Sequence, residues 1–233
     1  MAEPRRDLAG RVRAALAELL GTGLLVATVI GSGIAASRMS PTDVGLQLLE
    51  NALVTALALF VLIAVFAPIS GAYFNPVVLA ADAVLTPARR RDVPLFVVAQ
   101  LVGGALGAVL ANLMFGLPAV SIATTDRVSA DTVLGEVVAT AGLVLVILLL
   151  ARTGRSALIA PAVAAWIGAA YFFTSSTSFA NPAVALARML SDTFAGISPL
   201  SALAFVAAQL VGGALGLALA VLLTPRRSPG SAA

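Results

Sequence analysis

The chain has 233 residues, of which 60% are hydrophobic and 11% charged, and its mean hydropathy is +1.05. A soluble domain of this length could not bury so much apolar surface, so a soluble protein is excluded. The chain contains neither Cys nor His, which excludes disulfides, thiolate nucleophiles, zinc or haem sites and a His general base, and no cofactor or metal is expected. The net charge is only +3 and all 14 basic residues are Arg, mostly at segment ends, which favours contact with lipid headgroups over a nucleic-acid surface.

Apolar segments of bilayer length follow one another along the chain and predict an all-α membrane protein, because spanning segments must satisfy every backbone polar group internally. The segments are too long and too unalternating for barrel strands. We expect six transmembrane helices, at residues 14–37, 47–68, 93–115, 132–151, 157–174 and 200–223. Two shorter apolar stretches each begin with Asn-Pro and are too short to cross, so they are expected to be re-entrant half-helices, at about 76–86 and 182–190.

The distribution of Arg predicts the orientation of the chain in the membrane. If the N-terminus is cytoplasmic, three Arg lie outside (Arg38, Arg127 and Arg188) and 11 lie inside (Arg5, Arg6, Arg11, Arg13, Arg89, Arg90, Arg91, Arg152, Arg155, Arg226 and Arg227). This bias predicts an inner-membrane protein with both termini cytoplasmic, and residues 1–13 and 225–233 as cytoplasmic tails. The charged N-terminal lead is followed by a long apolar run without a small-residue cleavage site, which favours a retained first span over a signal peptide.

The chain also repeats itself. AQLVGGALG occurs at 99–107 and again at 208–216, Asn-Pro recurs at 75–76 and 181–182, and a Glu with Thr four residues later recurs at positions 18 and 136. Because each half has three spans, the second must enter the membrane from the opposite side, which predicts inverted repeats at about 14–115 and 132–224 with a site near the midplane. The glycines of GGALG have a spacing that lets helices approach closely, so they are expected to be packing residues.

These residues carry a family resemblance. The run SGAYFNPVVLA, the paired Asn-Pro motifs, the two Glu/Thr motifs and the inverted three-span halves are similar to the aquaporin, or major intrinsic protein, family over about residues 14–224. The resemblance implies one transmembrane channel domain without enzymatic activity, partners limited to membrane lipid and a small neutral solute, and a homotetramer. The chain departs from the family twice, with Val77 in place of the usual Ala of the first motif and Val184 where most members carry a selectivity Arg.

The Asn-Pro pairs explain how a helix can begin inside the membrane. Asn is a favoured N-cap and Pro is tolerated at the first helical position, so each pair is expected to start a half-helix and to leave the Asn amide as a donor toward a lumen. The alternative is an ordinary capped re-entrant turn. The two motifs expected at the pore are Asn75, Pro76 and Val77, and Asn181, Pro182 and Ala183.

The selectivity constriction follows from the resemblance, which implies Thr55, Ala169, Ser178 and Val184 at the family's four positions. All four are small or medium-sized and uncharged, and the ring lacks the bulky aromatic, the His and the Arg of water-selective members. A wide ring with two hydroxyls indicates larger neutral polyols or hydroxylated metalloids such as arsenous acid. The segment FTSSTSFANPAVALARMLSDTFAGI also resembles bacterial members associated with arsenic resistance.

Glu18 and Glu136 lie inside predicted spans, where an ionisable residue is costly and usually functional. One hypothesis makes them a proton relay. The other, which the resemblance favours, makes each carboxylate an acceptor for the loop before a half-helix, with Gln100 and Gln209 giving the same kind of support.

Arg188 follows Asn181 by seven residues and allows two interpretations. It could be a displaced filter Arg. The favoured alternative is a vestibule or headgroup-level Arg that reaches water and pairs with Asp192. Its counterpart in the first repeat is Asp82, expected toward the cytoplasmic mouth.

The sequence therefore predicts a passive channel for small uncharged solutes, in which the positive ends of two half-helices exclude ions and protons. The alternatives are a water-selective aquaporin and a proton-coupled transporter that uses Glu18 or Glu136. An intramembrane enzyme is disfavoured, because no plausible base or metal ligand is present.

Overall fold

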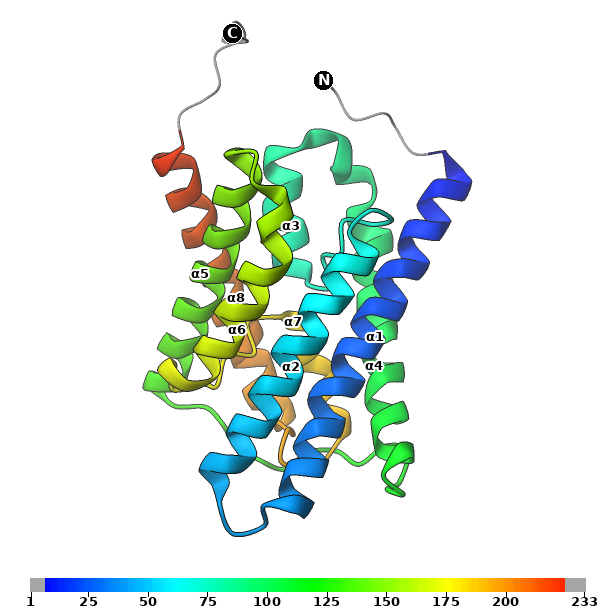
Figure 1. The fold of residues 1–233 in the computed structure, drawn as a ribbon, viewed down its shortest axis with the longest axis vertical. Helices are drawn as coiled ribbons and strands as arrows, with labels where there is room; N and C mark the ends of the chain where they lie inside the picture. Colours follow the sequence, from blue (N-terminus) through cyan, green and yellow to red (C-terminus); the bar gives the residue numbers. More distant parts are fainter. Residues whose placement is uncertain (1–6, 225–233) are drawn as a thin grey trace, which may run out of the picture.

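A computed structural model describes residues 7–224, and its secondary structure is helical (Figure 1). The six long helices are α1 (Leu8–Met39), α2 (Val44–Phe66), α4 (Val93–Met114), α5 (Ala130–Arg152), α6 (Ile159–Phe173) and α8 (Pro199–Leu223). The two short ones are α3 (Pro76–Leu85) and α7 (Pro182–Ala187), and single 3₁₀ turns lie at Pro87–Arg91, Ser156–Leu158 and Arg188–Leu190. Six helices, one of them α6 with the turn before it, are long and apolar enough to cross a membrane, as predicted.

The helices begin where the sequence supplies caps. The side chains of Asp7, Asp43 and Ser198 accept backbone N–H groups from the first turns of α1, α2 and α8, and Ser129 forms a capping box with Thr132 at the start of α5. Asp7 explains the main boundary difference from the sequence prediction. Because it accepts the N–H of Gly10 at 2.7 Å, α1 starts at Leu8, and residues 8–13 are helical. The rest of the predicted tails, with Arg5, Arg6, Arg226 and Arg227, lies outside the described residues.

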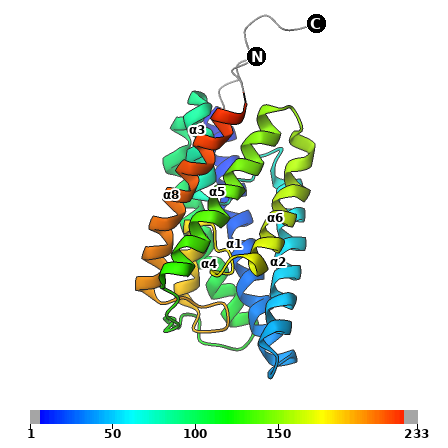
Figure 2. The ribbon, with the colours of Figure 1, turned by 90° about the vertical axis from the view of Figure 1, so that its left-hand side faces the viewer.

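The two halves of the chain are arranged as inverted repeats. The first helices of the halves, α1 and α5, run in opposite directions, and α1 packs against α4 just as α5 packs against α8 (Figures 1 and 2). The half-helices α3 and α7 enter from opposite ends and meet inside the bundle. The start of α1 and the end of α8 lie at one end of the molecule, which we call the terminal face, and the opposite end is called the far face (Figure 1).

Glycines allow the helix pairs of the two repeats to touch backbone to backbone. A Cβ atom on Gly103 of α4 would lie 2.2 Å from the carbonyl oxygen of Leu19 in α1, and one on Gly107 would lie 2.1 Å from that of Gly23. The second repeat shows the same contact, since a Cβ on Gly212 of α8 would lie 2.5 Å from the carbonyl oxygen of Val137 in α5. The GGALG glycines are therefore packing residues, as the sequence predicted.

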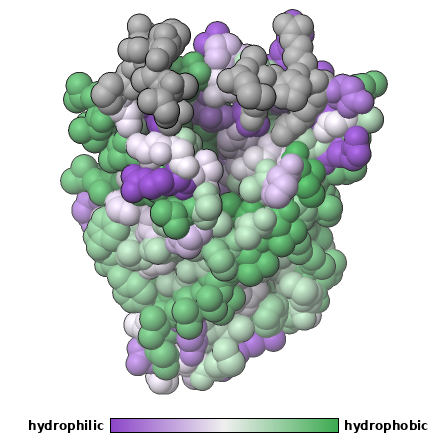
Figure 3. Space-filling view, turned by 45° about the horizontal axis from the view of Figure 1, so that its top comes forward, coloured by the Kyte–Doolittle hydropathy of each residue, from purple (hydrophilic) through white to green (hydrophobic). Residues whose placement is uncertain are grey.

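The outer surface of the bundle is apolar. Large hydrophobic side chains on several helices are exposed, including Leu16, Leu20 and Leu24 on α1, which share one helix face. Figure 3 shows hydrophobic side chains over the flank of the molecule and hydrophilic ones toward its ends. A water-soluble protein would not leave such a surface open, whereas lipid tails cover it without cost.

The candidate pore and its constriction

The two half-helices are joined at their N-termini by their capping Asn residues. The Oδ1 atom of Asn75 accepts the N–H of Val77 at 3.0 Å, and that of Asn181 accepts the N–H of Ala183 at 3.0 Å. Each amide then reaches across the repeat interface: Asn75 Nδ2 donates to the carbonyl of Ala180 at 2.7 Å, and Asn181 Nδ2 donates to that of Phe74 at 2.7 Å. One N–H of each amide is thus structural, and the other is left for the cavity that both residues line.

Unusual backbone conformations precede both half-helices. Ala72 and Phe74 in the first repeat, and Ser178 and Ala180 in the second, have φ between 48° and 53°, a region that L-residues other than Gly seldom occupy. Residues adopt such conformations where the surrounding structure over-determines them, and they gather at functional sites. Here the strained loops line the cavity on both sides of the Asn pair.

Glu18 holds the first of these loops. Its carboxylate accepts the backbone N–H groups of Tyr73 (3.0 Å) and Phe74 (2.8 Å), the hydroxyl of Ser70 (2.6 Å) and the side-chain amide of Gln100 (2.7 Å). Glu18 and Gln100 are fully buried, and neither lines the cavity.

Glu136 makes the matching contacts in the second repeat. It accepts the N–H groups of Phe179 (2.8 Å) and Ala180 (2.9 Å), the hydroxyl of Ser176 (2.7 Å) and the amide of Gln209 (2.6 Å). Both oxygens of each Glu are occupied by donors, and neither Glu136 nor Gln209 lines the cavity. Each carboxylate thus binds the backbone of the loop that precedes a half-helix.

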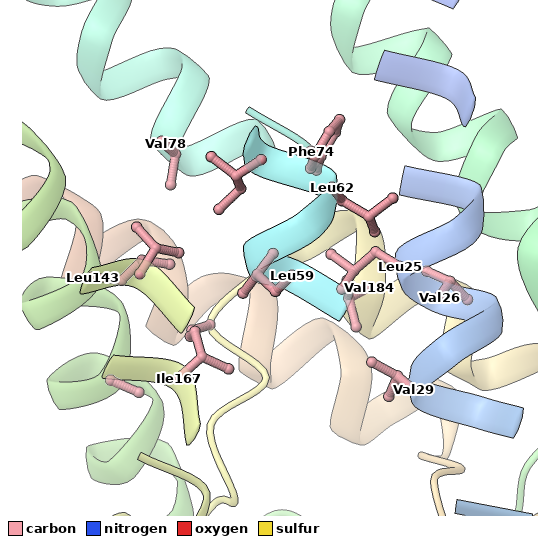
Figure 4. Close-up of a cluster of buried hydrophobic side chains, with 14 of the residues drawn as sticks. Leu25, Val26, Val29, Leu59, Leu62, Phe74, Val78, Leu143, Ile167 and Val184 are labelled. Carbon is pink, nitrogen blue, oxygen red and sulfur yellow. The ribbon is translucent and has the colours of Figure 1, made fainter. Parts of the chain in front are cut away.

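A cavity of about 320 Å³ runs past the Asn pair toward both ends of the molecule. Much of its wall is aliphatic, with Leu25 and Val29 from α1, Leu59 and Ile63 from α2, and Leu143 and Ile167 from α5 and α6. Figure 4 shows a cluster of buried hydrophobic side chains that includes Leu25, Leu59 and Val184 of this wall. Apart from the loops, polar side chains lie mainly toward its two mouths. The wall is therefore largely aliphatic but also includes the hydroxyl-bearing residues Thr55, Tyr171 and Ser178.

Three of the four residues expected at the constriction line this cavity: Thr55, Ser178 and Val184. Ala169 does not, and its exposed side makes it part of the outer surface of α6. Tyr171 takes this place, because it lines the cavity, is 4% exposed, and its hydroxyl donates to Thr55 Oγ1 at 3.3 Å. Two residues along a helix correspond to a rotation of about 200°, so Ala169 and Tyr171 lie on opposite faces of α6.

Not every motif residue faces the lumen. Pro76, Val77, Pro182 and Ala183 are absent from the cavity wall. Val77 instead packs on α8, where a Cβ added to Gly213 would lie 2.2 Å from Val77 Cγ1. The substitution of Val for Ala in the first motif is therefore matched by a Gly in the facing helix, and Val184 is the departure that reaches the pore.

Arg188 lies at the far-face mouth of the cavity and is 4% exposed. Its Nε donates to the carbonyl of Ala195, and its guanidinium carbon lies 3.5 Å from the centre of the Phe179 ring. The expected pairing of Arg188 with Asp192 is wrong, since Asp192 accepts the N–H of Thr124 at 2.9 Å instead. The position of Arg188 at the mouth agrees with a vestibule residue. The prediction assumed a straight half-helix, but α7 ends at Ala187 and the chain folds back over Arg188.

The terminal-face mouth carries a different polar cluster. Asp82, the repeat counterpart of Arg188, accepts the hydroxyl of Tyr73 at 2.5 Å and forms an ion pair with Arg89 at 3.0 Å. The Arg89 guanidinium also lies 5.6 Å from the centre of the Tyr73 ring, and all three side chains line the cavity. At this mouth the charge of Arg89 is thus neutralised by Asp82.

Comparison with known proteins settles the family. The family model "Major intrinsic protein" matches residues 7–179. The chain belongs to the major intrinsic protein family. This major intrinsic protein is therefore a passive membrane channel for small solutes and not an enzyme.

Relatives and solved structures agree with this assignment. The chain is 46% identical over 216 residues, or 92% of each sequence, to "Aquaglyceroporin AqpS" of Rhizobium meliloti (strain 1021). It is 33% identical over 118 residues, 51% of this chain and 42% of the relative, to "Probable aquaporin NIP7-1" of Arabidopsis thaliana. The fold matches the X-ray structure of the aquaglyceroporin from Plasmodium falciparum with a TM-score of 0.69 at 20% identity, over 90% of this chain and 95% of that one.

Proposed function

We propose that this channel conducts glycerol-like polyols and hydroxylated metalloids such as arsenous acid, together with water. The observation that carries the proposal is the composition of the constriction. Val184 replaces the Arg expected beside the second Asn-Pro motif, and three hydroxyl-bearing residues, Thr55, Tyr171 and Ser178, line the same cavity. A site lined by both hydroxyl-bearing and aliphatic side chains suits a solute that has both kinds of surface. The name of the Rhizobium relative, an aquaglyceroporin, points to the same class.

Ions and protons are excluded where the half-helices meet. The N-terminus of each half-helix resembles about half a positive charge, so a monovalent cation about 4 Å from both ends would experience on the order of 4 kcal/mol of repulsion at an effective dielectric constant near 20. The apolar wall adds the cost of dehydration. Neutral solutes meet neither penalty and can replace part of their hydration with the free N–H groups of Asn75 and Asn181.

A water-selective channel is the first alternative, and it requires a constriction narrow enough to stop glycerol. Uncharged side chains at Thr55 and Val184 favour the wider solute range. A proton-coupled transporter is the second alternative, and it needs a carboxylate with access to the solute path. Glu18 and Glu136 lie off the cavity with both oxygens engaged, which favours a passive channel.

We further propose one channel domain built from both repeats, in the inner membrane, with both termini cytoplasmic. The terminal face carries Arg89, Arg90 and Arg91 in one 3₁₀ turn, and the excess of Arg near this face supports the orientation. The exposed apolar helices leave room for lipid and for subunit contacts, and a homotetramer remains our expectation from the family.

Stopped-flow light scattering on proteoliposomes tests the proposed function. Water, glycerol and arsenous acid are compared at matched protein density, with empty liposomes as the background. We expect flux of all three, driven only by their own gradients. Fast water flux with no glycerol or metalloid flux would show a water filter. Accumulation of a solute against its gradient, on imposing a proton gradient, would show coupled transport.

A further inference from the structure

Arg188 is a buried cation on the solute path that the proposed function does not use. Its side chain is 4% exposed and lines the cavity at the far-face mouth. In the chain it follows Val184 by four residues. A charged side chain at membrane depth is costly, and it is usually retained where it faces a partner or a pathway. The surroundings of Arg188 decide between these two.

The guanidinium of Arg188 is held from two sides. Its Nε donates to the carbonyl of Ala195, and its face stacks on Phe179 with the carbon 3.5 Å from the ring centre. Phe179 is itself fixed, because its N–H donates to Glu136 at 2.8 Å and its ring meets that of Phe205 edge-on at 5.1 Å. Such contacts fix the direction of a cationic group without neutralising it.

Part of the guanidinium has no protein partner. Within residues 7–224, neither terminal nitrogen of Arg188 makes a hydrogen bond, and no carboxylate lies within ion-pair distance of the side chain. Both terminal nitrogens keep some accessible surface. Four of the five N–H donors of Arg188 are therefore left for water or solute in the cavity.

A second polar group on a residue of the cavity wall is also unpaired. The hydroxyl oxygen of Ser178, next to Phe179 in the chain, is buried without a hydrogen-bond partner although Ser178 lines the cavity. A buried hydroxyl left unpaired costs free energy unless a bound molecule satisfies it. The cavity wall thus combines the cationic donor of Arg188 with the aliphatic surface of Val184, and Ser178 lines the same cavity.

We infer that Arg188 is a specificity-determining residue, displaced outward by about one helical turn from the position that Val184 occupies. It binds neutral solutes through an oxygen acceptor, whether hydroxyl or oxo, and repels cations before they reach the Asn pair. The pore therefore has an apolar, uncharged ring at Val184 and a separate cationic donor in front of it. This inference rests on the proposed function, because it concerns the choice among solutes of the same pore.

The test compares Arg188→Gln with a matched control, Arg127→Gln. Arg127 donates to the carbonyls of Gly196 and Phe194, both at 2.8 Å, and its guanidinium carbon lies 5.6 Å from the centre of the same Phe179 ring. Unlike Arg188, it does not line the cavity. Methylammonium uptake and the ratio of glycerol to water permeability are measured in proteoliposomes. Arg188→Lys is included because it keeps the charge and loses the planar fork of donors.

We expect R188Q to raise methylammonium uptake about tenfold, the usual effect of one nearby unit charge, and to change the glycerol-to-water ratio severalfold. R127Q should leave both values within about twofold of wild type, and R188K should exclude methylammonium while changing the solute ratio. If R188Q does not yield monodisperse protein, R188K carries the test through the solute ratio.

Two results would overturn the inference. Unchanged methylammonium uptake and an unchanged solute ratio in R188Q would show that Arg188 does not act on the path. Equal effects of R127Q and R188Q would show that both act through their shared neighbours, the loop at 194–196 and the Phe179 ring, and not through a donor on the solute path. In either case wild-type glycerol flux leaves the proposed function standing, whereas absent glycerol flux in wild type refutes the proposed function itself.

Discussion

Asn181 donates its side-chain amide to the carbonyl of Phe74 across 107 positions of sequence, at a distance of 2.7 Å. Asn75 makes the reciprocal bond to the carbonyl of Ala180, also at 2.7 Å. Each Asn thus caps its own half-helix and binds the loop that precedes the other. These two bonds join the repeats at the loops before α3 and α7, where backbone carbonyls have no helical hydrogen-bond partner.

Replacement of Asn181 by Ala should destabilise the fold strongly. The change removes an N-cap, which costs about 1 kcal/mol of stability. It also leaves the buried carbonyl of Phe74 without a donor, which costs about 1–3 kcal/mol. We expect a loss of about 2–4 kcal/mol, measured by denaturant or thermal unfolding in detergent. Asn181→Asp is the informative partner, because it keeps the cap oxygen and loses the donor. Equal stability of N181D and wild type would mean that the cross-repeat bond contributes nothing.

Val77 and Val184 occupy different positions around the Asn-Pro motifs and should respond differently to mutation. Val77→Ala removes a side chain that packs on Gly213 and not on the cavity, so we expect a stability loss of about 1–2 kcal/mol and unchanged glycerol flux. Val184→Arg places a long cation in the cavity and should reduce glycerol flux more than water flux. Stopped-flow measurements on both variants check this. A large flux change in V77A would place Val77 on the solute path, contrary to its packing.

Replacement of Gly103 by Ala should weaken the contact between α1 and α4. The new Cβ would lie 2.2 Å from the carbonyl oxygen of Leu19, which neither backbone can avoid without moving. Overpacking of this kind costs about 1–3 kcal/mol. Gly45→Ala is the control, since its Cβ would meet only the Asp43 side chain at 3.3 Å, and Ala in a helix is favoured over Gly by up to about 1 kcal/mol. A G103A protein as stable as G45A would contradict the close helix contact.

Glu136→Gln tests the structural role of the buried carboxylates. The carboxylate accepts four donors, and a Gln side chain has one acceptor oxygen and brings its own N–H groups toward Ala180 and Gln209. We expect marked destabilisation, with wild-type flux unaffected by an imposed proton gradient. A stable E136Q protein whose solute flux lost a proton dependence seen in wild type would support the relay instead.

Much of the fold follows from local sequence. Hydropathy and length predict the six spans, the caps place their starts, and the paired Asn-Pro motifs predict two helices that begin inside the membrane. The repeated GGALG and the Glu/Thr motifs predict which residues pack and which support the loops. These features are local, or repeat within the chain, so a single sequence is enough to reveal them.

The sequence thus determined the class of molecule, the inverted repeats and the residues that start the half-helices. The tertiary structure decided which side chains face the solute. Ala169 and Tyr171 differ by two positions, and only the rotation of α6 within the bundle brings Tyr171 to Thr55. Arg188 looks like a residue near the membrane surface until the chain after α7 folds back and places the Ala195 carbonyl and Phe179 against it. Facing direction and burial depend on how distant segments pack, and this is why the composition of the filter could not be derived from spacing alone.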